Sequence, residues 1–241
     1  MQLLISVATV EEAATALAGG ADIVDAKDPA SGALGAVRLE VLGGIVEVVA
    51  GRRPVTAALG DASDAAAIES SARAYAGAGA ALVKVGFYGV VDEGRVASLL
   101  TAAVHGARSS RGGVIAVAYA DAKSDRAPSL DAVVRIAALT GARGVLLDTA
   151  RKDGPGLRGL ITASRLASWV ASAHAAGILV ALAGKLTADD LVFVRDAGAD
   201  IAGVRGAACE NGRTSRVVAE KVRLLRAAAL TFLTSAQPVE Q

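Results

Sequence analysis

The sequence predicts an α/β fold, a single closed (βα)8 TIM barrel, and three observations support this prediction. The length of 241 residues is close to the roughly 250 residues that such a barrel typically occupies. Short β-branched and apolar runs alternate with alanine-rich stretches of helical character. A glycine often ends the helical stretch, as in LAGGADIVDAK (residues 17–27), because glycine adopts the left-handed C-cap conformation at little cost.

Each expected strand is a short apolar run of the kind that is buried in a parallel sheet. The opening run forms the first strand, five more runs follow glycine-capped helices, and two lie in longer gaps, within RRPVTAALGD and GGVIAVAYAD. The expected strands span residues 3–6, 22–27, 54–59, 81–86, 113–118, 144–148, 179–183 and 201–205. The expected helices span residues 9–18, 38–50, 63–77, 92–109, 129–140, 163–176, 188–196 and 214–229.

The alternative is an open doubly wound sheet, which has the same alternation of elements. The first strand is followed by ISVATVEEA and not by GxGxxG, which disfavours the dinucleotide-binding form of that fold. We therefore expect one catalytic domain over residues 1–229 and a C-terminal tail over residues 230–241.

Composition narrows the possible classes of function. A net charge of +1 argues against a nucleic-acid surface, and no apolar run is long enough to cross a membrane. The single cysteine, Cys209, and the absence of a basic-then-apolar leader predict a protein of the reducing cytoplasm. No spacing of histidine, cysteine and carboxylate residues suggests a metal site, and we expect no cofactor.

The distribution of lysine is the strongest functional signal. Bulk positive charge comes from 19 arginines, whereas five of the six lysines lie at strand ends or within four residues after them. Arginine cannot lose its proton in a protein, but a desolvated lysine can, and it then becomes a nucleophile or a base. These strand-end lysines are Lys27, Lys84, Lys123, Lys152 and Lys185.

Side-chain alternation predicts which of these groups meet inside the barrel. Asp25 and Lys27 lie two residues apart on one face of the second strand, and Asp148 ends the sixth. Lys84 is flanked by two valines, so it points inward if they pack against the helices. One lysine could then be neutral near pH 7 and form an imine with a carbonyl, while another group moves protons.

The same residues also have a purely structural interpretation, in which Asp25 neutralises Lys27 and Asp148 neutralises Lys84. The loops after the seventh and eighth strands commonly bind phosphate in such barrels, because glycine lets backbone N–H groups approach an anion. The predicted phosphate-binding residues are Gly184, Lys185, Arg205, Gly206 and Ala207. The glycine-rich loop over residues 28–35 is either a lid over the site or a tight connection.

Several segments, taken together, resemble a known family. DAKDPASGALGA, LVKVGFYG, LLDTARKDG, ALAGKL and DIAGVRGAACENGR are similar, in this order, to segments of the (5-formylfuran-3-yl)methyl phosphate synthases of methanofuran biosynthesis. The resemblance covers nearly the whole chain. Each motif alone is a weak signal, but DxKDPxxGxLGA, VKVGxYG and GVRGAAC together are specific.

The resemblance implies a carbon–oxygen lyase that condenses two molecules of glyceraldehyde 3-phosphate to 4-(hydroxymethyl)-2-furancarboxaldehyde phosphate, with loss of phosphate and water. It implies that Lys27 forms the Schiff base, that Lys84 transfers protons, and that Asp25, Asp148 and Lys152 assist. Two alternatives are a simpler Schiff-base sugar-phosphate aldolase and a non-catalytic sensor of phosphorylated metabolites. The expected ligand is a triose phosphate, and the expected assembly is a homo-oligomer.

Overall fold

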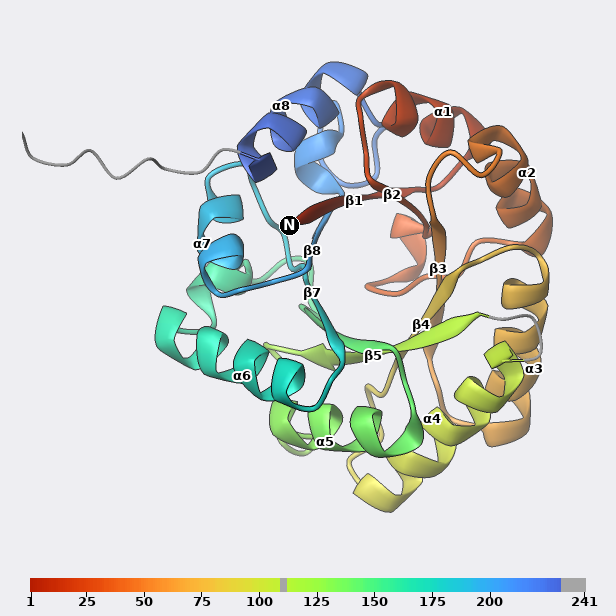
Figure 1. Ribbon diagram of the computed structural model, residues 1–241, viewed down its shortest axis with the longest axis vertical. Coiled ribbons are helices and arrows are strands. Elements are labelled where there is room, and N and C mark those ends of the chain that lie inside the picture. Colours follow the sequence, from red (N-terminus) through yellow and green to blue (C-terminus); the bar gives the residue numbers. More distant parts are fainter. Residues whose placement is uncertain (109–111, 231–241) are drawn as a thin grey trace, which may run out of the picture.

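The computed structural model describes residues 1–108 and 112–230. Over these residues, eight parallel strands pair in sequence order, and β8 pairs with β1 to close a barrel that eight helices surround (Figure 1). The strands are β1 (Gln2–Val7), β2 (Ile23–Ala26), β3 (Val55–Asp61), β4 (Leu82–Gly86), β5 (Gly113–Tyr119), β6 (Gly144–Asp148), β7 (Leu179–Leu182) and β8 (Ile201–Val204). The helices are α1 (Val10–Ala18), α2 (Leu39–Val49), α3 (Ala65–Gly77), α4 (Glu93–Arg108), α5 (Leu130–Thr140), α6 (Ala163–Ala175), α7 (Asp190–Asp196) and α8 (Ala219–Leu230).

Alternation along each strand divides the apolar residues between two layers. In β4, Val83 and Val85 belong to the large core between the strands and the helices. Inward-facing residues such as Ile115 and Leu146 form a separate cluster inside the barrel. Lys84 lies between the two valines and lines the interior, as its neighbours predicted.

Four of the helices, α1, α3, α5 and α6, begin at polar caps, and α3 and α4 pack closely through small residues. Thr9, Asp64, Ser129 and Thr162 each accept a backbone N–H from the first turn of the helix that follows, which satisfies a donor that would otherwise lack a partner. Between α3 and α4, a Cβ at Gly106 would lie 2.2 Å from the carbonyl oxygen of Glu69. Such close approach brings the outer layer tightly around a barrel that contains few aromatic residues.

The predicted (βα)8 barrel is confirmed, with local differences. The last helix begins at Ala219 and not at residue 214, because Ser215 bonds the backbone of Asn211 and Gly212 in a turn that competes with helix formation. Three short 3-10 turns were not predicted. They are η1 (Pro29–Ser31), η2 (Leu157–Gly159) and η3 (Gly206–Ala208). Residues 231–241, which include nearly all of the predicted tail, and Ser109, the predicted end of the fourth helix, lie outside the described residues.

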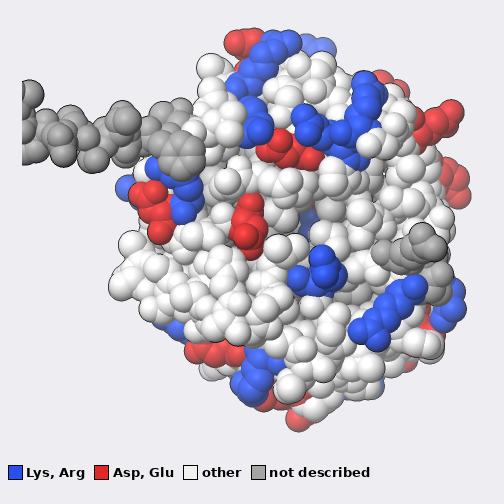
Figure 2. Space-filling model, in the orientation of Figure 1, with Lys and Arg blue, Asp and Glu red and all other residues white. Residues whose placement is uncertain are grey.

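Figure 2 shows the end of the barrel that faces the reader in Figure 1. Basic and acidic side chains are interspersed on this face, with uncharged surface between them. This mixture differs from the continuous basic surface that is typical of nucleic-acid-binding proteins. Across residues 1–108 and 112–230, no helix is both long enough and apolar enough to span a membrane.

Candidate active site

A cavity of about 440 Å³ extends from the barrel interior to the carboxyl ends of the strands. All the predicted site residues line it except Asp25, which is completely buried behind it. Residues of β1 and of β3 to β8 line the cavity, and the inward-facing residues of β7 and β8 include small ones. Ala181, Ala183 and Gly203 leave the space that larger side chains would fill.

Lys84 of β4 and Asp25 of β2 form a buried ion pair inside the barrel, across the intervening strand β3. The ammonium group of Lys84 lies 2.5 Å from Oδ2 of Asp25, which also accepts a hydrogen bond from Ser6 Oγ at 2.9 Å. The other carboxylate oxygen accepts a bond from Thr56 Oγ1 at 2.7 Å. Burial raises the pKa of Asp25, but the charges of Lys84 and Lys27 and these bonds outweigh burial, so the pKa lies below its usual value. Asp25 is therefore an anion that fixes the position of Lys84.

Asp148 and Lys152 form the second pair. The Lys152 ammonium group lies 2.9 Å from Asp148 Oδ1 and also donates to the carbonyl and hydroxyl oxygens of Thr149. Burial raises the pKa of Asp148, yet the charges of Lys152 and Lys27 hold it below its usual value. Asp121, two residues after β5, accepts the backbone N–H of Ala150 and so anchors the loop that carries Lys152.

Lys27 differs from both of these lysines. Among the described residues, no carboxylate lies within 4 Å of its ammonium group, although its side chain is nearly buried. Burial lowers the pKa of Lys27 to about 8. The negative charges of Asp148 and Asp25 oppose this shift, whereas the positive charges of Lys84 and Lys152 strengthen it. At pH 7, roughly a tenth of such amines are neutral, against roughly one in three thousand for an ordinary lysine. Lys27 is therefore the residue best suited to attack a carbonyl.

These pairs are not the ones that a purely structural interpretation of the sequence suggested. Asp25 pairs with Lys84 and not with Lys27, while Asp148 pairs with Lys152 and not with Lys84. Sequence reasoning also missed Ser6 and Thr56, which hold Asp25. Both lie at alternate, inward-facing positions of their strands, so the pattern that located Asp25 could have found them too.

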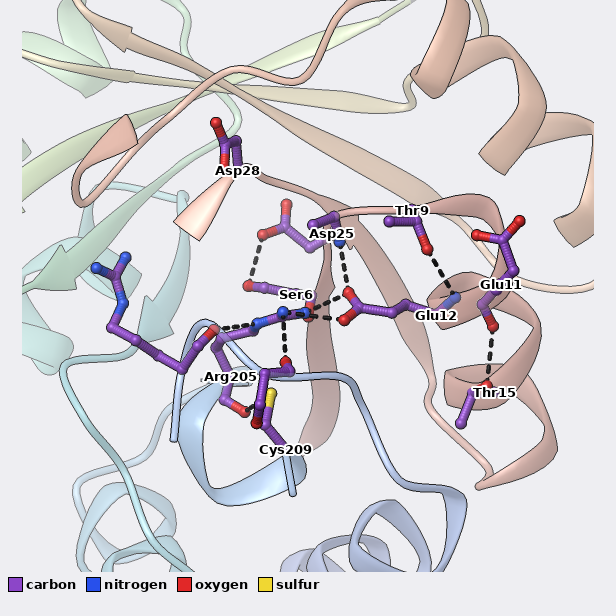
Figure 3. A network of polar contacts seen from close by, with 12 residues as sticks. Ser6, Thr9, Glu11, Glu12, Thr15, Asp25, Asp28, Arg205 and Cys209 are labelled. Carbon is purple, nitrogen blue, oxygen red and sulfur yellow. Dashed lines mark hydrogen bonds and ion pairs between the residues drawn. The ribbon is translucent and has the colours of Figure 1, made fainter. Parts of the chain in front are cut away.

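The guanidinium of Arg205 is committed to other protein groups (Figure 3). It forms a two-pronged ion pair with Glu12, at 2.5 and 3.0 Å. Its remaining donors reach backbone carbonyls at 2.8 to 3.0 Å, those of Ser6, Arg213 and Ser215. All five guanidinium N–H groups therefore have partners. Arg205 lines the cavity but retains no donor for the phosphate that the sequence assigned to it.

The loop after β7 exposes its backbone to the cavity. Gly184 and Lys185 have positive φ values of 105° and 59°, and the Lys185 ammonium group donates to the carbonyl of Gly154. A Cβ at Gly184 would lie 3.1 Å from Thr149, so a larger residue would be both strained and crowded. After β8, Gly206 and Ala207 belong to the 3-10 turn η3 and also line the cavity.

The glycine-rich loop after β2 closes one side of the barrel mouth. Leu34 is 3% exposed and packs with the interior cluster near Gly86 and Tyr119. The Tyr119 hydroxyl donates to Asp61 at 2.7 Å, and neither residue lines the cavity. Leu34 thus packs at the mouth beside the ends of β4 and β5, and it does not itself line the cavity.

Sequence reasoning also missed one cationic residue at the mouth of the cavity. Arg213, in the loop between β8 and α8, lines the cavity and donates to the carbonyl oxygen of Gly32 at 2.9 Å. It lies at the end of the GVRGAACENGR motif, where only Arg205 had been considered. Within the described part of the chain, no group of three or more His, Cys, Asp or Glu residues could hold a metal ion.

Comparisons with known proteins agree with this architecture and identify the family. A solved 3-hexulose-6-phosphate synthase has the same fold, with a TM-score of 0.64 over 95% of this chain and 99% of that one, at 23% identity. The (5-formylfuran-3-yl)methyl phosphate synthase of Methanopyrus kandleri is 39% identical over 222 residues, 89% of this chain and 92% of the relative. The Methanosarcina barkeri enzyme of the same name is 37% identical over 228 residues, 93% of this chain and 97% of the relative. The family model described as 4-HFC-P synthase matches residues 3–226, and the chain belongs to this family.

Proposed function

We propose that this chain is a (5-formylfuran-3-yl)methyl phosphate synthase, a lyase that condenses two molecules of glyceraldehyde 3-phosphate through an imine on Lys27. Family membership supplies the reaction, which belongs to methanofuran biosynthesis. The observation that carries the mechanism is the Lys27 amine, which has a pKa of about 8 and no carboxylate within 4 Å over residues 1–108 and 112–230. A sensor of metabolites would gain nothing from this costly arrangement, because a buried charge without a partner destabilises the fold.

The first steps use the neutral amine. Nitrogen of Lys27 attacks the aldehyde carbon of one triose phosphate, a C–N bond forms, and the carbonyl oxygen leaves as water. The imine withdraws electrons, so the neighbouring carbon releases a proton and becomes an enamine carbon. That carbon attacks the aldehyde of the second triose phosphate and forms the new C–C bond. A hydroxyl oxygen of the second triose unit then adds to the imine carbon, which closes the ring and breaks the C–N bond, so that Lys27 leaves as the free amine. Loss of phosphate and water yields the aromatic furan ring.

The two ion pairs supply proton transfer near this amine. Lys84 is held by Asp25 at 2.5 Å, which fixes its direction and leaves two of its three N–H groups to donate. Asp148 is an anion whose charge acts on Lys27 and which Lys152 holds at 2.9 Å. We assign Lys84 as the acid for the departing oxygen and Asp148, with Lys152, as the group that receives and returns protons.

The loops after β7 and β8 are assigned to phosphate. Gly184 and Lys185 approach the cavity with their backbone, and Lys185 adds a positive charge that has no carboxylate within 4 Å among the described residues. Gly206 and Ala207 face them from the next loop.

We also retain the predictions of a homo-oligomer and of a cytoplasmic location, which light scattering and cell fractionation test.

Borohydride trapping tests the imine. Reduction in the presence of glyceraldehyde 3-phosphate should attach the triose to Lys27, as peptide mass mapping would reveal. Lys27→Arg should abolish both the adduct and the ultraviolet absorbance of the furan product, because arginine stays protonated. Lys123→Arg, at an exposed loop lysine, is the matched control and should behave as wild type. Furan formation by the Lys27→Arg enzyme would refute the imine mechanism.

A further inference from the structure

The charges around the cavity separate into paired and unpaired groups. Of the residues that the structure describes, six cationic side chains line it, namely Lys27, Lys84, Lys152, Lys185, Arg205 and Arg213. Three of them are neutralised by carboxylates, in the pairs Lys84–Asp25, Lys152–Asp148 and Arg205–Glu12. Lys27 is reserved for the substrate carbonyl, so Lys185 and Arg213 are the cations available to a phosphate group.

Arg213 has the donors that Arg205 lacks. Over the described residues, its guanidinium makes one hydrogen bond, from Nη2 to the carbonyl of Gly32 at 2.9 Å. Four of its five N–H groups therefore remain available to a ligand. Its backbone is also held in place, since its carbonyl accepts a bond from Arg205 Nε at 2.8 Å. Arg205 thus fixes the loop, and the side chain of Arg213 is available to bind a ligand in the cavity.

The surroundings of Arg213 fit an anion at the mouth of the cavity. The side chain is partly buried, and burial lowers the pKa of its guanidinium, while the negative charges of Asp148 and Asp28 oppose the shift. A guanidinium that is partly removed from water binds an anion more strongly than an exposed one. Its planar fork can also contact two phosphate oxygens at once, which the Lys185 ammonium group cannot do.

We propose that Arg213 is the guanidinium that binds the phosphate group of a triose phosphate substrate, in the place that the motif suggests for Arg205. This inference rests on the function proposed above. Arg213 also reaches Gly32, in the loop that begins directly after Lys27. A phosphate held by Arg213 therefore lies beside the segment that carries the imine-forming lysine, which aligns the triose for attack at its other end.

Paired variants in one loop test this assignment. Arg213→Gln removes the charge above the cavity, whereas Arg216→Gln removes an exposed arginine that pairs with Glu210 in the same loop. Borohydride trapping is measured for each enzyme with glyceraldehyde 3-phosphate and with glyceraldehyde, which lacks the phosphate. Binding of inorganic phosphate is measured by calorimetry in parallel.

Arg213→Gln should raise the glyceraldehyde 3-phosphate concentration for half-maximal trapping by about 10- to 100-fold, the effect of losing hydrogen bonds to a charged group. Trapping of glyceraldehyde should stay within twofold of wild type, phosphate affinity should fall in parallel, and Arg213→Lys should recover part of both. Equal losses with the two aldehydes, or unchanged phosphate binding, would overturn the assignment. If the proposed function itself were wrong, the wild-type enzyme would give no adduct at Lys27. That result differs from both outcomes that would overturn the assignment of Arg213.

Discussion

At the scale of single residues, the chemistry depends on the difference between three neighbouring lysines. Lys84 and Lys152 each have a carboxylate within 3 Å, and each is held in one position by it. Lys27 is buried, and the described part of the chain places no carboxylate that close to its amine, so burial lowers its pKa to about 8. The paired lysines act on Lys27 through their charge, so substitutions of its neighbours should change its protonation without touching it.

The pH dependence of imine formation should follow the charge of these neighbours. In wild type, the rate of borohydride trapping at Lys27 should rise with pH and level off above about pH 8, as the amine loses its proton. Lys84→Met removes a positive charge that lowers the pKa of Lys27, so its curve should move to higher pH. Asp148→Asn removes a negative charge that raises this pKa, so its curve should move to lower pH. Shifts of both variants in one direction would contradict this account.

Much of the site could be predicted at this scale, because the alternation of side chains along a strand is a local property. The valines beside Lys84 established its direction, and Asp25 and Lys27 share a face for the same reason. The partner of each charge could not be predicted. Asp25 reaches Lys84 across β3, and that distance depends on the register between strands and the curvature of the barrel.

At the scale of elements, the ends of the strands are fitted to one another through small residues. Gly86 closes β4, and a Cβ there would lie 2.1 Å from Asp61 Oδ1 and 2.4 Å from the Tyr119 hydroxyl. The contact between Asp61 and Tyr119 joins the ends of β3 and β5 across this glycine. A side chain on β4 would therefore separate two strand ends that border the barrel mouth.

Gly86→Ala should lower the free energy of unfolding by about 1 to 3 kcal/mol, because an added methyl group overpacks this contact. Gly43→Ala provides the opposite control. Gly43 lies inside α2 with open space around the position of a Cβ, so alanine should raise the free energy of unfolding by about 0.5 to 1 kcal/mol. Urea denaturation of both variants measures these effects, and equal destabilisation by the two would refute the packing argument.

The positions of helices and strands could be predicted from the sequence, whereas the conformations of the loops that complete the site could not. Glycine caps and apolar runs indicated where each strand begins to within a residue or two. The loop before α8 was mistaken for helix because residues 214–218 contain no proline or glycine. Hydrogen bonds of Ser215 hold it in a turn instead, and this turn keeps Arg213 outside the helix and beside the cavity.

At the scale of the whole molecule, the ion pair between Arg205 and Glu12 joins the first and the last βα units of the barrel. It connects the loop after β8 to α1, next to the place where β8 pairs with β1. Arg205 also donates to the carbonyl of Ser6, whose hydroxyl group holds Asp25. No local pattern could have revealed this contact, since 193 residues separate its partners.

Glu12→Gln should lower the free energy of unfolding by about 3 to 5 kcal/mol, because it leaves the buried guanidinium of Arg205 without a countercharge. Glu11→Gln, at the neighbouring exposed position, should change it by less than about 0.5 kcal/mol. Equilibrium unfolding in urea would measure both values. Similar losses in the two variants would show that the pair does not hold the barrel closed.

The seam between the first and last strands also has a consequence for the order in which the protein is made. Lys27 and Lys84 leave the ribosome long before Arg205 and the walls supplied by β7 and β8. Until β7 and β8 have been synthesised and have joined the barrel, we expect the Lys27 amine to remain hydrated and protonated, with the ordinary pKa of lysine. An unfinished chain is thereby protected from capturing sugar aldehydes, and the nucleophile becomes reactive when synthesis of the ring is complete.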